Sequence, residues 1–111
     1  PLWAVKFFEH KEDRDHTYRL QKFASEFFAA PPVGKVLVVS RPSRFGLVEP
    51  FWGYITGVAK VDKKIPYDKM SELDELLRSI GITWKDKRRV NCGWYNGKVV
   101  CIDFDCETMA E

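Results

Sequence analysis

The sequence predicts an α+β fold, a single domain over residues 1–111, on three observations. Two segments carry apolar residues at helical spacing, short strand-like runs stand between them, and an Asn-Gly pair separates two apolar runs near the C-terminus. The predicted order is strand, helix, two strands, helix, two strands. This β-α-β-β-α-β-β order matches a split βαβ (ferredoxin-like) sheet with two helices on one face and a C-terminal hairpin.

The first strand and the first helix follow directly from the pattern of apolar residues. Residues 2–8 (LWAVKFF) form an apolar run with β-branched and aromatic side chains, typical of a strand with little solvent on either face. Residues 16–30 then carry an apolar stripe opposite charged side chains, which indicates a helix. Asp13 or Asp15 is suited to cap its start, and the two prolines that follow end it.

The middle of the sequence predicts two strands joined by an exposed loop. Residues 35–40 (KVLVVS) and 51–61 (FWGYITGVAKV) are rich in β-branched and aromatic residues. The stretch between them, RPSRFGLVEP, contains prolines, a glycine and two arginines, so we expect a loop over residues 41–50. Gly53 and Gly57 indicate a bulge or a strong twist in the later strand.

The second helix is predicted from an apolar stripe at helical spacing between Met70 and Ile80. Ser71 and Asp74 resemble a capping box at its start, and Gly81 is suited to its end. We therefore expect a short helix with a marked beginning and end.

Asn96-Gly97 predicts the C-terminal hairpin, since both turn residues must take a positive φ. Its strands lie within residues 87–95 and 98–105. Counting outward from a two-residue turn places Cys92 opposite Cys101, at a pair without mutual backbone hydrogen bonds. The two thiols either close a cross-strand disulfide or remain free as small core side chains.

Two helices on one sheet face would leave the other face available for binding. Trp52, Tyr54 and Thr56 point to one side of their strand, while Phe51 and Ile55 point to the other. We expect Trp52 and Tyr54 on the exposed face, where aromatic side chains can stack on bases. The alternative is that both rings pack under the loop of residues 41–50.

Composition and charge exclude few classes of protein. The chain has 111 residues, 45% of them hydrophobic, which is enough for a core without disulfides, and its net charge is +2. No apolar run approaches the length of a membrane span, so we expect no membrane association. Three cysteines fit a reducing compartment, so we expect an intracellular protein without distinguishing cytoplasm from nucleus.

Basic residues gather at two places in the sequence, around Phe45 and just before the hairpin. Such groups can neutralise phosphates, and an arginine beside an aromatic ring can also stack on a base. We therefore predict a small nucleic-acid-binding domain, RNA or DNA. The predicted contact residues are Arg41, Arg44, Phe45, Trp52, Tyr54, Lys87, Arg88 and Arg89.

The alternative function is a protein-interaction or regulatory module without a nucleic-acid role. An aromatic sheet face would then bind a protein partner or a second copy of the chain, with a weak response to salt. Both functions are binding functions, and neither requires a cofactor.

One feature of the sequence favours an enzymatic function. The alternating carboxylates Asp103, Asp105 and Glu107 could together hold Mg²⁺. No matching lysine, histidine or phosphate-binding loop motif accompanies them, so we expect no enzyme and no bound metal. Zinc is also not expected, because the cysteines lack C-x-x-C spacing.

Overall fold

The computed structural model describes residues 2–104 and the strand at residues 108–109. Along the chain the elements are β1 (Trp3–Phe8), α1 (Lys11–Glu26), β2 (Val33–Pro42), β3 (Val48–Gly57), α2 (Tyr67–Ser79), β4 (Ile82–Thr83), the 3-10 helix η1 (Arg89–Asn91), β5 (Cys92–Tyr95), β6 (Lys98–Cys101) and β7 (Thr108–Met109). This confirms an α+β domain with the order β-α-β-β-α and a C-terminal hairpin.

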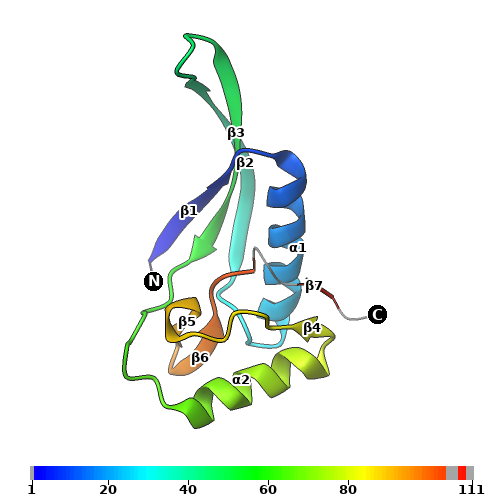
Figure 1. The fold of residues 1–111 in the computed structure, drawn as a ribbon, viewed down its shortest axis with the longest axis vertical. Coiled ribbons are helices and arrows are strands. Elements are labelled where there is room, and N and C mark those ends of the chain that lie inside the picture. Colours follow the sequence, from blue (N-terminus) through cyan, green and yellow to red (C-terminus); the bar gives the residue numbers. More distant parts are fainter. Residues whose placement is uncertain (1, 105–107, 110–111) are drawn as a thin grey trace.

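The three longest strands form one antiparallel sheet in the order β1-β3-β2. β2 and β3 continue past β1 as a two-stranded ribbon that projects from the body of the molecule (Figure 1). The expected ten-residue loop is therefore wrong, because pairing reaches Pro42 and Val48 and leaves a short turn. In that turn Ser43 N donates to Leu47 O at 2.6 Å, and Gly46 takes the positive φ that the turn requires.

α1 covers one face of this sheet and begins earlier than the sequence predicts. It starts at Lys11 with His10 as its N-cap, so the expected caps Asp13 and Asp15 lie inside its first turns. Arg14, which is buried, fixes the helix to the sheet: its guanidinium donates to Leu37 O at 3.2 Å and Gly53 O at 2.9 Å.

The second half of the described chain forms a separate layer below the sheet (Figure 1). Here α2 packs against the β5-β6 hairpin and the short strand β4. α2 begins at Tyr67 after Pro66, so the expected capping box of Ser71 and Asp74 is wrong. Asn96 and Gly97 both have positive φ, which confirms the predicted hairpin turn.

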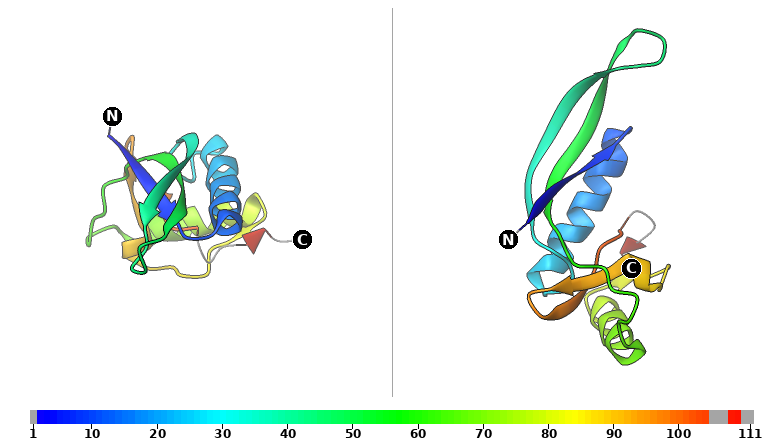
Figure 2. Two further views of the ribbon diagram at one scale, coloured as in Figure 1. Left: turned by 90° about the horizontal axis from the view of Figure 1, so that it is seen from above. Right: turned by 90° about the vertical axis from the view of Figure 1, so that its left-hand side faces the viewer.

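The ferredoxin-like arrangement with both helices on one sheet face is not shown. Among the named strands, β5 pairs with β6 and β4 pairs with β7, and neither pair joins the β1-β3-β2 sheet. Only α1 of the two described helices packs on that sheet, whereas α2 lies against the hairpin, as the two views of Figure 2 also show. The two layers are joined instead by a shared core.

The core runs through both layers. Leu20 and Ala24 of α1 belong to the same buried cluster as Leu73 of α2, Val99 of β6 and Phe104. Backbone bonds also cross the junction, since Cys101 N donates to Ala29 O and Lys60 pairs with Trp94. Among the described residues, no helix combines the length and apolar character that crossing a membrane would require.

Candidate functional site

The predicted residues Arg41, Arg44 and Phe45 lie in the projecting ribbon. Phe45 is 80% exposed at the turn, with the guanidinium of Arg44 6.0 Å from its ring centroid. Arg41 instead covers the ring of Phe51 at 3.9 Å and lies 3.4 Å from the carboxylates of both Glu9 and Glu49. The charge of Arg41 is thus balanced within the protein.

The second predicted basic group, Lys87 to Arg89, lies in the segment between β4 and β5. Each of its side chains has an internal partner. Lys87 Nζ is 3.1 Å from Asp74, Arg88 forms two hydrogen bonds with Asp86, and Arg89 Nε donates to Ile65 O. The ring of Tyr67 also lies 4.1 Å from the Arg89 guanidinium.

The expectation that Tyr54 and Trp52 lie on the exposed sheet face is wrong. Tyr54 is completely buried beneath α1, where its hydroxyl donates to Gln21 Oε1 at 2.5 Å. Trp52 lies on the same side, half-buried, 5.6 Å from the guanidinium of Arg14. The aromatic residues on the sheet face opposite α1 are Trp3, Phe7 and Phe51 instead.

The structure therefore does not bring the eight predicted residues together. Arg41, Arg44 and Phe45 belong to the ribbon, whereas Lys87 to Arg89 belong to the layer below the sheet (Figure 1). The molecule measures 49 × 32 × 22 Å, and the ribbon extends along the longest dimension.

A different set of polar residues is linked at the junction of the two layers, through the backbone of Ile102. Lys6 of β1 points toward α1, with Nζ 2.8 Å from the carbonyl of Ile102 and 3.5 Å from Gln21 Oε1. Gln21 is held in turn by Tyr54 and by its own donation to Thr56 Oγ1 at 2.7 Å. The lysine is thereby fixed beside the chain that leads into Asp103.

The loop before β5 supplies the opposite side of this junction. Asn91 is buried. Its side-chain amide donates to the backbone carbonyl of Asp86 at 3.0 Å, and its backbone carbonyl accepts from Ile102 N at 3.0 Å. The backbone that carries Asp86 and Asn91 is thus bonded to the segment that carries Asp103. We call Lys6, Asp86, Asn91 and Asp103 the junction site.

The electrostatics of the junction site centre on Arg88. Two hydrogen bonds of 2.7 Å from its guanidinium lower the pKa of Asp86 below its ordinary value, despite an opposing effect of burial. The same bonds raise the pKa of Arg88, and the negative charge of Asp103 acts in the same direction. Asp86 is therefore ionised at neutral pH.

Sequence reasoning missed three of these four residues and found Asp103 only as part of an acidic run. The sequence signals were Ala4-Val5-Lys6 in the first strand, Asp86 followed five positions later by Asn91, and Asp103-Phe104 after the hairpin. Each is too short to stand out alone, and only the folded chain brings them together.

Other features of the described chain supply no comparable site. No group of three or more histidine, cysteine or acidic side chains that could hold a metal occurs in the described residues, and Asp105 and Glu107 lie outside them. Cys92 and Cys101 stand directly opposite each other, as predicted; both are buried and no disulfide joins them. Cys106 lies outside the described part of the chain.

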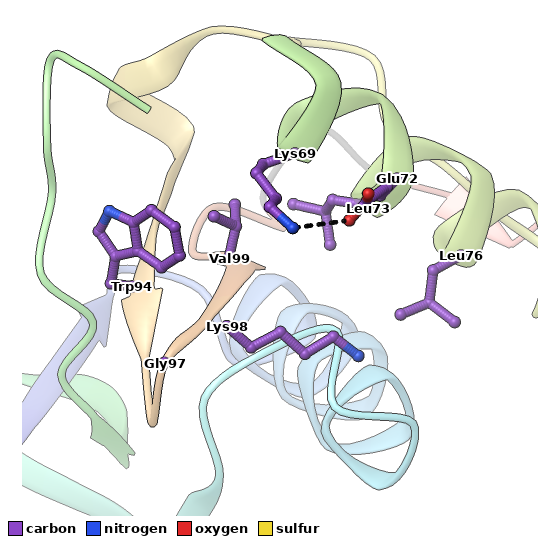
Figure 3. A pocket seen from close by; sticks show the side chains of 8 residues that line it. All are labelled: Lys69, Glu72, Leu73, Leu76, Trp94, Gly97, Lys98 and Val99. Carbon is purple, nitrogen blue, oxygen red and sulfur yellow. Dashed lines mark ion pairs between the residues drawn. The ribbon is translucent and has the colours of Figure 1, made fainter. Parts of the chain in front are cut away.

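A shallow pocket between α2 and the hairpin is mostly apolar (Figure 3). Trp94 and Val99 line its hairpin side, and Leu73 and Leu76 line its helix side. Lys69 and Glu72 form an ion pair of 3.5 Å at its rim. Lys98 lines the pocket as well, so the lining carries one positive charge beyond this ion pair.

Comparison with protein-family models and with curated proteins finds no match to this chain.

Proposed function

We propose that the junction site binds the phosphates of a nucleotide together with Mg²⁺. The observation that carries the proposal is the convergence of Lys6 with the loop of Asp86 and Asn91 and with the segment of Asp103. These residues come from three separated parts of the sequence. A fixed lysine, an amide and two carboxylates, one of which is paired with Arg88, form a composition suited to a metal-bound phosphate.

The same residue types recur in the same order in protein kinases. There a strand lysine contacts the α- and β-phosphates, an aspartate precedes by five positions an asparagine that holds Mg²⁺, and the aspartate of an Asp-Phe-Gly motif holds Mg²⁺. In this chain Lys6, Asp86, Asn91 and Asp103 stand at the corresponding positions. The positions of these residues in the fold support the proposal. Lys6 lies on a strand, Asp86 and Asn91 lie in the segment before the hairpin, and Asp103 follows the hairpin.

Several departures from that pattern limit the proposal to binding. In kinases the strand lysine pairs with a glutamate of a helix, and here the helix residue beside Lys6 is Gln21. Trp84-Lys85 stands in place of the His-Arg that precedes the kinase loop aspartate, and Asp105 stands in place of the glycine of Asp-Phe-Gly. Phosphoryl transfer is therefore not part of the proposal, and the expectation that the protein is no enzyme stays a prediction.

The proposed roles follow from the chemistry of each group. The ammonium of Lys6 would pair with phosphate oxygens, while Asp103 and the Asn91 amide would bind Mg²⁺, whose remaining ligands are phosphate oxygens and water. Because so few protein ligands hold the ion, metal and nucleotide should bind together rather than separately.

The test is thermal unfolding with Mg²⁺ alone, ATP alone, and both. At ten times the dissociation constant, joint binding should stabilise the fold by about 1.4 kcal/mol, roughly 5 °C in melting temperature. Asp103→Asn and Lys6→Met should abolish that rise. Lys63→Met and Asp68→Asn, at exposed positions, should keep it.

The readout is the rise caused by the ligand in each variant, because Lys6→Met also removes the bond to Ile102 and lowers stability by itself. The proposal fails if Mg²⁺-ATP gives no rise in the wild-type protein. It also fails if the Lys6 and Asp103 variants retain the full rise.

The nucleic-acid function expected from the sequence stays a prediction with narrower support. Of its predicted contacts, Phe45 and Arg44 are exposed at the ribbon turn. Among the described residues, no carboxylate lies within 4 Å of the Arg44 guanidinium. A salt titration of oligonucleotide binding tests it, since phosphate contacts weaken steeply with salt. No binding at low salt would exclude this function.

A further inference from the structure

The sheet face opposite α1 is an exposed apolar surface built by all three strands. The strand register places Trp3, Val5, Phe7, Val39, Phe51 and Ile55 on this face, which we call the open face. Trp3, Val5, Phe7 and Val39 are each at least 39% exposed. In the right-hand view of Figure 2, α1 lies behind the strands and the open face is turned toward the viewer.

The surface of the open face is ordered by its own packing. The rings of Phe7 and Phe51 stack with centroids 5.0 Å apart, and the guanidinium of Arg41 extends the stack. Phe7 also lies over Gly53, where a Cβ atom would meet the ring at 2.9 Å. A partner would therefore meet a preorganised surface, which lowers the entropic cost of binding.

Charges stand at opposite ends of the open face. Glu9, Arg41 and Glu49 form an ion-paired cluster of net negative charge at the ribbon end, and Arg44 lies farther out, in the turn. At the other end a bulge sets Gly34 and Lys35 together opposite Ile55, which places exposed Lys35 beside the apolar residues. One such face is thus complementary to a second copy turned end for end.

We infer that the protein forms a two-fold symmetric dimer in which two open faces pack against each other. Aligned sheets pack about 10 Å apart with their apolar side chains interdigitated. A two-fold axis through the apolar centre would set Lys35 of each copy against Glu9 and Glu49 of the other, as an isologous interface requires.

The test is sedimentation velocity over a wide range of protein concentrations. Val39→Glu should abolish the dimer by placing a carboxylate in the apolar centre. Val38→Glu is the matched control, because Val38 is the next residue of the same strand, has similar exposure and points to the α1 side. Far-UV circular dichroism checks that both variants remain folded.

A charge exchange tests the orientation of the two copies. Lys35→Glu should weaken the dimer at least tenfold, and the double variant Lys35→Glu with Glu9→Lys should restore it. The inference is overturned if the wild-type protein is monomeric at every concentration. It is equally overturned if Val38→Glu and Val39→Glu weaken association alike, or if the double variant is no better than Lys35→Glu alone.

Discussion

Phe28 occupies a backbone position that helices usually give to glycine. Its φ is +61°, Ala29 N donates to Ala24 O and Phe28 N donates to Ser25 O, which together form a Schellman motif with phenylalanine at its left-handed residue. The ring is 72% exposed, so burial offsets little of the strain. Phe28→Gly should therefore stabilise the protein by about 1 kcal/mol, measured by urea unfolding.

Phe28→Ala is the control for this prediction, because alanine removes the ring but keeps the Cβ atom that causes the strain. We expect its free energy of unfolding to stay within about 0.5 kcal/mol of the wild-type value. Equal effects of the glycine and alanine variants would show that backbone strain is not the cause.

Cys92 provides a prediction about pH. Burial raises the pKa of its thiol, and only the charge of Arg89 opposes that effect. Because the thiolate is the reactive form, a raised pKa moves the onset of alkylation to higher pH. Iodoacetamide at pH 8 should leave Cys92 unmodified in the native protein and modify it in denaturant, as resolved by peptide mass spectrometry. Rapid labelling under native conditions would contradict the burial of this side chain.

Among the elements, α1 depends on Arg14 for its attachment to the sheet. Arg14 is buried and bonds the carbonyls of Leu37 and Gly53 on two strands. Arg14→Ala should destabilise the fold by about 2 to 3 kcal/mol, since charged hydrogen bonds and packing are lost together. Arg19→Ala, at an exposed position of the same helix, should change the unfolding free energy by less than about 0.5 kcal/mol. Similar effects of the two variants would exclude this anchoring role.

The order of the two helices and the longer strands could be predicted from the sequence, but the faces of the strands could not. Periodicity identifies which residues of β3 share a side, yet Tyr54 and Phe51 are both large aromatic residues and give no sign of which side α1 takes. Hydrogen bonds from α1 determine which side the helix covers. Gln21 accepts from the Tyr54 hydroxyl, and Arg14 donates to the carbonyl of Gly53. Alternation alone therefore led to the wrong exposed aromatics.

The junction site was beyond local patterns for a related reason. Lys6 and Ile102 are 96 positions apart, and their contact depends on the hairpin forming a layer of its own instead of joining the sheet. A fold with a single sheet, as the element order suggested, would have placed Asp103 on a strand with no reason to approach Lys6. The error in topology and the missed site thus have one cause.

At the scale of the whole molecule, the shared core predicts that the two layers unfold together. Leu20 and Ala24 of α1 are covered by residues of the second layer, and Lys6, Ala29 and Lys60 bond across the junction. Far-UV circular dichroism, which follows both layers, should give the same urea midpoint as tryptophan fluorescence. A fragment of residues 1–60 should lack a cooperative unfolding transition. Without the second layer, the side of α1 that carries Leu20 and Ala24 would be exposed to water. Two separate midpoints, or a fragment that unfolds cooperatively, would show that the layers are independent and that the junction between them is a docking contact rather than a core.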